Sequence, residues 1–434
     1  MADMKQVIII GAGIIGGAIA YEMAKAGWGV TVVDKAPEAG YGSTSNSSAV
    51  IRINYSVLET CAMALEGWSY WRDWAGYVGL PQDRPVASYK ETGSLVIYSG
   101  EGAAMGRITD IMDQIGGTYE RLAPEGIHRF LPGADLSSYA PARRMDDPDF
   151  GEPGEEQIGG AVFFQQAGYV NDPKLAAQNL QWAAQAAGAQ YLFRSTVTAL
   201  EIHDGRPTGV RLEDGRVLKA DVVVNAGGPW SAGLNRMAGV TGDMTIRTRP
   251  NRQEVAYIPG PANMDYRHDG IVIADLDAEF YARPDPVGIC VGSTDPACDP
   301  HEFIDDPDAV DTRFTDQWTT IVMRGAMRLP EMRIPGQASG LVALYDTSDD
   351  WLPIYDKTSL PGFYMACGTS GNQFKMAPVV GKLMTHLIAK TEAGHDHDAS
   401  PLDFLLERTG RRIDLGIYSR KRKINADSSF SVMG

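Results

Sequence analysis

The chain has 434 residues, a length that predicts two domains rather than one ordinary core. Hydrophobic residues make up 44% and charged residues 22%, which is the balance of a compact globular protein and not of a disordered chain. The formal net charge of −16 argues against nucleic acid as a partner, because duplex binding uses basic patches that neutralise phosphates. We therefore expect a two-domain globular protein that does not bind nucleic acid.

The cysteines and the apolar runs exclude further classes. Cys61, Cys290, Cys298 and Cys367 form no CxxC pair and have no histidine at metal-ligand spacing, so neither a zinc site nor a disulfide framework is expected. The first apolar run, residues 7–10, is short and is followed at once by glycine, which predicts a strand and not a signal peptide or membrane span. No later stretch is long enough to cross a bilayer. These features favour a cytoplasmic protein without a bound metal.

The N-terminal sequence predicts a βαβ unit. Residues 7–10 are typical of a buried strand, and residues 14–25 have helical apolar spacing that stops at Gly27. Residues 29–33 are typical of the next strand. This order calls for a parallel sheet covered by helices.

Beyond this unit the sequence predicts a second domain inserted into the first. A polar loop over 42–48 is followed by a helical stretch that contains Trp68, Trp71 and Trp74, and residues 81–156 alternate short strand-like pieces with loops rich in proline, glycine and aspartate. Helices are predicted over 172–188 and 378–391. Strands are predicted over 93–98, 189–193, 197–203, 209–212, 220–225, 253–258, 270–274, 279–283, 288–292 and 362–367, of which the four from 253 to 292 are expected to be antiparallel.

Three glycines, Gly11, Gly13 and Gly16, lie between the first strand and the first helix. They stand where a tight turn, close backbone approach and helix–strand packing require glycine, and the helix N-terminus is free to face a pyrophosphate. Asp34 ends the second strand, where its carboxylate can accept hydrogen bonds from ribose hydroxyls and would repel the 2′-phosphate of NADP. The motif predicts a dinucleotide site, but it does not separate NAD from FAD.

Further segments decide between these cofactors by resemblance. Residues 34–35, the loop 42–46 with the sequence Gly-Ser-Thr-Ser-Asn, residues 220–230 and residues 368–375 occur in the order found in the D-amino-acid oxidase superfamily of flavoenzymes. Within that superfamily the chain is most similar to the sarcosine oxidase and glycine oxidase branch, and the resemblance extends to about Lys390. It implies that the cofactor is FAD.

The resemblance also implies which residues contact FAD. In that family the first two strand ends hold the AMP half, the small polar loop reaches the pyrophosphate and the ring, and a middle strand supplies an adenine contact, for which Val197 is the matching position. Taken singly, the loop serines and Asn46 are also ordinary turn residues. The expected FAD-binding residues are Gly11, Gly13, Ile14, Ile15, Gly16, Asp34, Lys35, Ser43, Thr44, Ser45, Asn46, Val197, Ala226, Gly227, Trp230, Gly371, Asn372, Gln373 and Lys375.

Five residues are candidates for the catalytic site. Arg52 is a lone cation in an apolar stretch, and a buried guanidinium needs an anionic partner, either a substrate carboxylate, which the resemblance favours, or a structural aspartate. Lys375 is expected either near flavin N1 and the C2 carbonyl or beside Arg52 on the carboxylate, and a surface position is the alternative. Tyr281, Arg283 and Tyr345 belong to strands expected to cover the flavin, although core packing would equally explain both tyrosines.

Four positions depart from the sarcosine oxidase pattern. Ala343 stands where the monomeric enzyme has the cysteine that bonds covalently to the flavin, so the resemblance implies noncovalent FAD. Asp295 stands near the position of the lysine that helps that enzyme react with oxygen, which leaves the electron acceptor open. Ser45 and Ala49 replace basic side chains.

We expect an α/β fold with a doubly wound, Rossmann-like FAD-binding domain and a second α+β substrate domain built on a mainly antiparallel sheet. The first is assigned to residues 1–80, 157–242 and 335–392, the second to 81–156 and 243–334, and a C-terminal tail to 393–434. Within the tail, the basic run 420–423 is expected to be a solvated face or a docking surface for a partner.

The reaction implied by the resemblance is the oxidation of a small amine or amino acid that carries a carboxylate, of the N-methyl or D-amino-acid type. A hydride passes to flavin N5 and an imine is formed. Two alternatives stay open at this stage. One is a 2-hydroxy acid or polyol-phosphate dehydrogenase of the same superfamily, and the other is a flavoprotein subunit that is active only in a complex with a partner subunit or an electron-acceptor protein.

Overall fold

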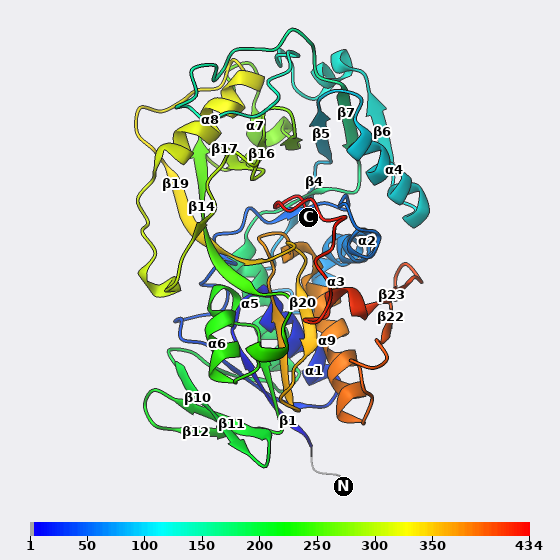
Figure 1. The fold of residues 1–434 in the computed structure, drawn as a ribbon, viewed down its shortest axis with the longest axis vertical. Coiled ribbons are helices and arrows are strands. Elements are labelled where there is room, and N and C mark those ends of the chain that lie inside the picture. The colour runs from blue at the N-terminus through cyan, green and yellow to red at the C-terminus, as the bar shows by residue number, and fades with distance from the viewer. Residues whose placement is uncertain (1–3) are drawn as a thin grey trace.

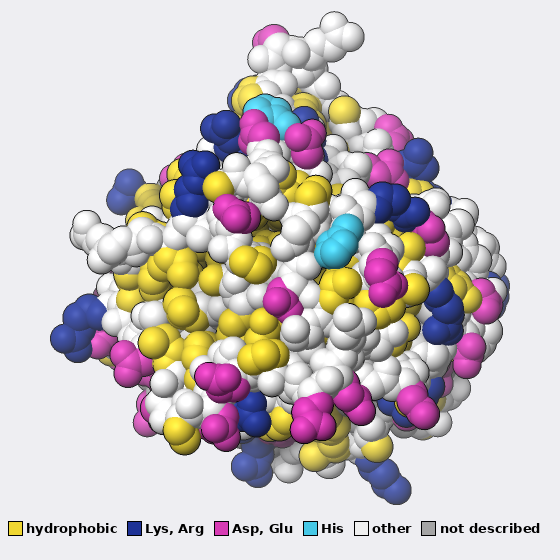
Figure 2. All heavy atoms as spheres, turned by 90° about the horizontal axis from the view of Figure 1, so that it is seen from above, with side chains coloured by type: hydrophobic (Ala, Val, Ile, Leu, Met, Phe, Trp, Pro, Cys, Tyr) yellow, Lys and Arg dark blue, Asp and Glu magenta, His cyan; other side chains and the backbone are white. Residues whose placement is uncertain are grey.

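Two large sheets divide the molecule into two halves, which lie one above the other in Figure 1. The structure is a computed structural model that describes residues 4–434. Within these residues no helix is long and apolar enough to span a bilayer. On the face shown in Figure 2, lysine and arginine side chains are scattered among acidic ones and do not form one basic area.

The lower half is built on a six-stranded sheet. All of its neighbouring strands pair in parallel except β20 and β21, which are antiparallel. Because both faces are covered, β1 is buried over four successive apolar residues. In spatial order the strands are β20 (Ile354–Lys357), β21 (Phe363–Cys367), β13 (Val222–Asn225), β1 (Gln6–Ile10), β2 (Gly29–Val33) and β9 (Gln190–Leu192).

Helices cover this sheet as the sequence predicts. The first helix, α1 (Ile14–Lys25), has the predicted bounds and packs between α5 (Pro173–Ala186) and α9 (Ala377–Glu392). Asp172 begins α5 by accepting a hydrogen bond from the Leu175 backbone N–H at 2.8 Å. The other helices are α2 (Leu58–Arg72), α3 (Trp74–Val78), α4 (Ala103–Ile115), α6 (Ser231–Met237), α7 (Tyr266–Asp269) and α8 (Asp316–Arg328).

The upper half is built on a nine-stranded, mostly antiparallel sheet, in which only β15 and β5 pair in parallel. Trp318, Ile321 and Val322 of α8 pack on this sheet and close its core. In spatial order the strands are β18 (Glu302–Phe303), β14 (Thr248–Ile258), β17 (Gly288–Ser293), β16 (Phe280–Asp285), β15 (Val272–Asp275), β5 (Ser94–Tyr98), β7 (Gly160–Phe164) and β6 (Tyr119–Leu122), and β19 (Gly340–Ser348) pairs with β14.

Smaller elements complete the fold. Two short sheets contain β10 (Val197–His203), β11 (Arg206–Leu212) and β12 (Val217–Lys219), and β3 (Val50–Ile51), β8 (Gly168–Val170) and β4 (Tyr89–Glu91). A hairpin of β22 (Asp403–Leu405) and β23 (Arg412–Asp414) lies in the tail. The 3-10 turns are η1 (Pro124–Arg129), η2 (Gly228–Trp230), η3 (Thr241–Asp243), η4 (Pro307–Ala309), η5 (Phe374–Met376) and η6 (Leu415–Tyr418).

The structure differs from the sequence expectation in the second domain. The ranges 81–156 and 316–328 contain the helices α4 and α8, where only strands and loops were expected. Strands β7 and β19 join the nine-stranded sheet, although both lie in ranges assigned to the FAD-binding domain. At these two strands the sheets do not follow the assigned ranges. The domain boundaries given above stay a prediction.

The expectation for the basic run 420–423 is wrong for its arginines. Arg420 is 0% exposed and forms ion pairs with Asp243, Asp356 and Asp398 at 2.7–3.0 Å. Arg422 pairs with Asp350 at 2.7 Å. Their charge is neutralised by ion pairs inside the fold, because a buried guanidinium is stable only when carboxylates surround it. The tail is thereby fastened to the lower half before it runs back between the two halves (Figure 1).

We predict that Arg420→Met lowers the free energy of unfolding by about 3–5 kcal/mol, because it leaves buried carboxylates without their cation. Arg129→Met is the matched control, since Arg129 pairs with Glu120 at 2.5 Å at the surface. Loss of an exposed pair costs about 1 kcal/mol or less. Urea unfolding followed by circular dichroism measures both changes. Equal effects of the two substitutions would contradict the structural role of Arg420.

Candidate active site

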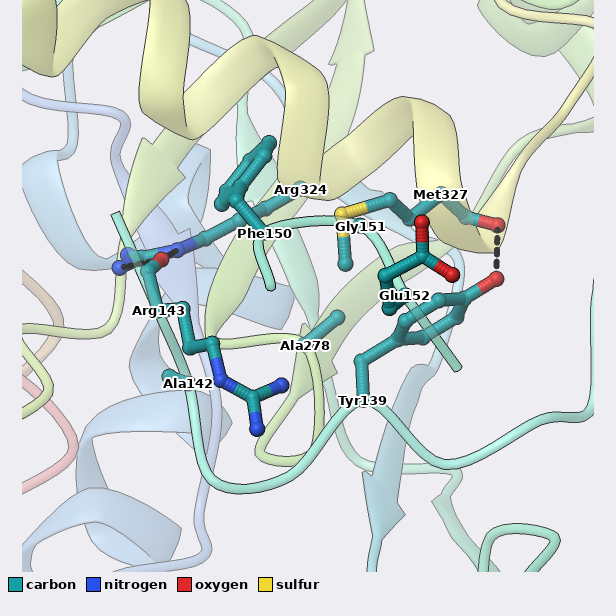
Figure 3. A pocket seen from close by; sticks show the side chains of 9 residues that line it. All are labelled: Tyr139, Ala142, Arg143, Phe150, Gly151, Glu152, Ala278, Arg324 and Met327. Atoms are coloured by element: carbon teal, nitrogen blue, oxygen red, sulfur yellow. Dashed lines mark hydrogen bonds between the residues drawn. The ribbon is translucent and has the colours of Figure 1, made fainter. Parts of the chain in front are cut away.

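One large cavity, with a volume of about 1060 Å³, lies between the two main sheets. It is at the upper end of the usual range for ligand pockets, about 300–1,000 Å³, and so has room for a dinucleotide and a small substrate. Its lining comes from the ends of β1 and β2 on one side and from β14, β15, β16 and β19 on the other. A second depression, beside α8, has about 10 Å³ and is shown in Figure 3. It is too small to hold more than one water molecule.

Most of the predicted site residues line the large cavity, although they come from distant parts of the sequence. Three do not line it, namely Gly16, Ser45 and Arg283. The predicted residues that do are Gly11, Gly13, Ile14, Ile15, Asp34, Lys35, Ser43, Thr44, Asn46, Arg52, Val197, Ala226, Gly227, Trp230, Tyr281, Tyr345, Gly371, Asn372, Gln373 and Lys375.

The glycines after β1 form a cradle into which no side chain fits. A Cβ atom on Gly11 would lie 2.2 Å from the Ala226 carbonyl oxygen, and Gly11 has a φ of +114°. A Cβ atom on Gly16 would lie 2.0 Å from the Gly11 carbonyl oxygen, so Gly16 supports the turn from behind. The first turn of α1 therefore approaches the cavity with bare backbone, which is the arrangement that a pyrophosphate needs.

Two polar side chains fix this turn. The Asp34 carboxylate accepts hydrogen bonds from the backbone N–H groups of Ala12 at 2.6 Å and Ala36 at 2.8 Å. The Thr44 hydroxyl accepts from the Ile14 N–H at 3.0 Å and so caps α1, whose N-cap residue Gly13 has no side chain to do this. The polar loop thus contacts the helix end that is expected to face the cofactor.

Lys35 joins the two halves at the rim of the cavity. Its ammonium lies 4.1 Å from the centre of the Trp230 ring and forms an ion pair with Asp308. Asp308 belongs to η4, in the connection between β18 and α8 of the upper half. Asp308 and its neighbours Pro307, Val310 and Thr312 also line the cavity. We expected only a cofactor contact for Lys35, and the pairing with Asp308 was not foreseen.

Arg52 is 6% exposed and has no carboxylate partner within 4.0 Å among residues 4–434. The structural aspartate that we considered as its partner is therefore not found in the described part of the chain. Its guanidinium instead donates to the backbone carbonyl of Asn54 and stacks 4.0 Å from the Tyr55 ring centre. It also donates to the carbonyls of Val432 at 3.0 Å and Met433 at 2.7 Å. Burial lowers the pKa of Arg52.

Lys375 is also buried, at 4% exposure, which excludes the surface position considered for it. Its ammonium donates to the Tyr55 hydroxyl and to the Asn372 carbonyl, both at 2.8 Å. Burial, and then the charge of Arg52, hold the pKa of Lys375 well below its usual range. Tyr55 thus contacts both cations, one on its ring face and one on its hydroxyl. No motif or spacing indicated this role of Tyr55.

The residues from the upper sheet divide into two groups. Tyr281 and Tyr345 line the cavity, and the Tyr281 hydroxyl lies 3.0 Å from Ser48 Oγ. Burial raises the pKa of both tyrosines, so both hydroxyls stay protonated. Arg283 lies outside the lining, pairs with Asp285 at 3.3 Å and donates to the Ser48 carbonyl at 2.6 Å. It is suited to hold the Ser48 loop and not to touch a ligand.

Two carboxyl groups near the cavity are unusual. Asp346 lines the cavity, and burial raises its pKa to about 7. Asp295 lies outside the lining, and burial raises its pKa to about 7 as well. Both groups can hold a proton near neutral pH. Ala343 lines the cavity, and none of the cysteines or histidines of residues 4–434 does.

The cavity has further lining residues that the sequence did not reveal. Gln253 of β14 and residues 272–274 of β15 form part of the upper wall. Val432 and Met433 of the tail form another part. Strand residues in an alternating pattern do not by themselves indicate a binding site. The tail residues act through their backbone carbonyls, which residue types do not reveal.

A parallel sheet with a bare glycine turn at its carboxyl edge, facing an antiparallel sheet across one large cavity, defines a two-domain dinucleotide-binding enzyme. Residues 6–387 match the family described as "DAO: FAD dependent oxidoreductase", and the chain belongs to that family. Its cofactor is FAD, and the glycine cradle, the Asp34 carboxylate and the size of the cavity fit this group. The resemblance noted in the sequence is thereby confirmed.

Individual relatives are distant. The chain is 25% identical to sarcosine oxidase subunit beta of Arthrobacter sp, over 94% of this chain and 92% of that protein. It is 22% identical to 4-methylaminobutanoate oxidase (formaldehyde-forming) of Paenarthrobacter nicotinovorans, over 90% of this chain but 44% of that protein. It thus spans about half to two thirds of the length of several curated relatives that it matches.

The fold is also found among solved structures. The L-proline dehydrogenase from P.horikoshii superposes with a TM-score of 0.74 at 20% identity, covering 97% of this chain and 98% of that chain. Glycine oxidase from Bacillus cereus gives a TM-score of 0.66 at 22% identity, covering 91% and 96%. At these identities the likeness shows the shared fold.

We predict that Gly16→Ala weakens FAD binding at least about tenfold, because the new Cβ atom would collide with the Gly11 backbone. Gly17→Ala is the control on the same helix, where the new Cβ atom would lie 3.3 Å from the Leu180 side chain and away from the turn. Titration of the apoprotein with FAD, followed by quenching of flavin fluorescence, gives both affinities. Equal affinities would show that the turn does not bind the cofactor.

Proposed function

We propose that the chain oxidises a small amine or amino acid that carries a carboxylate, of the N-methyl or D-amino-acid type, with noncovalent FAD. Support comes from the family and from relatives whose names describe amine and amino-acid substrates. Support for noncovalent binding comes from Ala343, and from the lack of a cysteine or histidine in the lining formed by residues 4–434.

One observation carries the substrate class. Arg52 and Lys375 are two buried cations that share Tyr55 and line the cavity, and neither has a carboxylate within 4.0 Å among residues 4–434. Buried like charges repel each other and are costly to desolvate, so an anionic group placed between them would be strongly favoured. A substrate carboxylate supplies that anion, and the fork of Arg52 suits its geometry.

The residues of the chain then position the substrate for the reaction. FAD, when bound, takes up a hydride from the carbon next to the amine nitrogen, and an imine remains, which water hydrolyses. Arg52 and Lys375 hold the carboxylate and so fix the distance from this carbon to the cofactor, which lowers the entropic part of the barrier. Tyr281 and Tyr345 keep water from the upper side of the cavity and remain protonated donors.

A panel of substrates tests this proposal. Holoenzyme is mixed without oxygen with N-methyl amino acids, D-amino acids, L-amino acids and 2-hydroxy acids, and loss of flavin absorbance is recorded. We expect rapid bleaching by carboxylate-bearing amines and much slower bleaching by the same amines without the carboxylate. Bleaching by 2-hydroxy acids alone would select the alcohol-oxidising alternative and refute the amine proposal.

A second candidate is a flavoprotein subunit that turns over only in a complex. It is favoured by the match along 92% of a relative that is itself named a subunit. The Asp295 carboxyl at the position expected for an oxygen-activating lysine agrees with an acceptor other than oxygen. Purified chain, an active substrate and a soluble dye acceptor decide between the two. Turnover in the dye assay shows that no partner is needed for substrate oxidation.

We predict that Arg52→Gln reduces kcat/KM for carboxylate-bearing amines by about 30-fold or more, which corresponds to the loss of about 2–5 kcal/mol of a buried charge pair. Oxidation of an amine without a carboxylate should change little. Arg72→Gln, at an exposed arginine of α2, is the control. Equal losses for both kinds of amine would mean that Arg52 does not bind the carboxylate.

We predict that carboxylate affinity falls as pH rises through the lowered pKa of Lys375, because the anion binds the charged amine and raises that pKa on binding. Binding should therefore take up a proton. Asp346, with a pKa of about 7, acts in the same direction, since its ionised form repels the anion. Comparison with Lys375→Met isolates the contribution of the lysine. In that variant the slope of log affinity against pH should be smaller by one proton. An unchanged slope would contradict the role of Lys375.

A further inference from the structure

The tail reaches the candidate active site. Arg420 and Arg422 fasten it to the lower half, and the Ser428 hydroxyl donates to the Asp350 carbonyl at 2.6 Å. From there residues 430–434, called the tail segment below, run to the cavity. The tail segment contains no helix or strand, and Phe430 has a φ of +53° and is 43% exposed. Residues 431–433 are half-buried and Gly434 is buried, and Met433 is the one side chain of the segment that packs against the main core, so few side-chain contacts hold it in one place.

The tail segment is held mainly through Arg52 and its neighbours. Val432 and Met433 offer their carbonyls to Arg52 Nη2, at 3.0 and 2.7 Å. The backbone oxygen of Gly434 accepts from the Ser56 N–H at 3.1 Å and from its hydroxyl at 2.7 Å. The acceptors that the tail segment offers to Arg52, those of Val432 and Met433, are neutral main-chain carbonyls, so they neutralise none of its charge.

The contacts at Nη2 conflict with a carboxylate. A guanidinium presents two pairs of parallel N–H groups to a carboxylate, one formed by Nε and Nη2 and one by Nη1 and Nη2. Both pairs include Nη2, and in this structure Nη2 donates to Val432 and Met433. A bidentate carboxylate therefore requires at least one of these carbonyls to leave.

We propose that the tail segment is a displaceable wall of the substrate site, which substrate carboxylates push away from Arg52. This inference rests on the proposed function, because it takes Arg52 as the carboxylate partner. An anion is a stronger acceptor for a buried guanidinium than two neutral carbonyls, so the exchange is favourable once a carboxylate arrives. The site therefore favours small carboxylates, because the carboxylate group must enter the space that residues 432 and 433 occupy.

The test measures binding of acetate, a carboxylate without an amine to oxidise, to the FAD-loaded protein through the shift in flavin absorbance. A chain that ends at Ser429 lacks the tail segment and should bind acetate about tenfold more tightly, because no hydrogen bonds at Nη2 are broken first. Its FAD affinity should be unchanged. Ile424→Ser, at a side chain that is 56% exposed in the same tail, is the control and should bind acetate as the unaltered protein does.

A second variant tests the inference without shortening the chain, in case the shortened chain misfolds. In Gly434→Ala the new Cβ atom would lie 2.3 Å from the Tyr55 ring, whose hydroxyl is held by Lys375 and Asn372, so the tail segment must shift. Tighter acetate binding is expected here as well. Unchanged or weaker acetate binding in both variants would overturn the inference, because the tail segment would then be a fixed support of Arg52.

Hydrogen exchange measures the displacement directly. Saturating acetate should speed exchange in peptides that cover residues 430–434, and should have no effect there in Arg52→Gln. Slower exchange with acetate would mean that the tail segment closes over the ligand, and would also overturn the inference. If Arg52→Gln binds acetate as tightly as the unaltered protein, the carboxylate role in the proposed function fails too. If Arg52→Gln loses acetate affinity but neither the shortened chain nor Gly434→Ala gains it, that role stands and the displaceable wall does not.

Discussion

Arg52 and Lys375 carry like charges, lie on one tyrosine and are both buried, and this unbalanced pair constrains the rest of the site. Desolvation opposes the charged form of both groups, and the charge of Arg52 further opposes that of Lys375, which is why the pKa of each is lowered. The fold tolerates them by surrounding them with neutral acceptors, namely the carbonyls of residues 54, 372, 432 and 433. The site is thereby prepared for an anion, because neither cation forms an ion pair with a carboxylate of residues 4–434.

The cofactor half of the site depends on a different constraint, close approach of backbone. A Cβ atom added to Gly11 would collide with the Ala226 carbonyl oxygen, and one added to Gly16 would collide with the Gly11 carbonyl oxygen. The side-chain oxygens of Asp34 and Thr44 accept hydrogen bonds from the N–H groups of Ala12 and Ile14, which this turn leaves unpaired. Rigid main chain thus forms one side of the cavity, whereas the other side is made of side chains from strands and of the tail.

Sequence reasoning predicted the parts of the fold that have strong local signals. The helix α1 has the expected bounds because its apolar spacing is continuous and Gly27 follows it. The helix α8 was not expected, since its two threonines, its β-branched residues and Gly325 are weak helix formers. It is stable because Trp318 and Ile321 are buried and Arg328 reaches two buried aspartates. In the site, side-chain roles at Arg52 and Lys375 could be anticipated, but carbonyl contacts from residues 432 and 433 have no residue-type signature.

The ion pair of Lys35 with Asp308 has a further consequence at the rim of the cavity. It joins the two halves where the cavity opens, and Asp308 is 60% exposed, so water and salt can reach it. Exposed pairs of this kind contribute little free energy and are weakened by ionic strength. The contact at this rim is therefore expected to open readily in salt, whereas the hydrogen bonds from Ser43 to Leu344 and from Arg283 to Ser48 still join the two halves beside it.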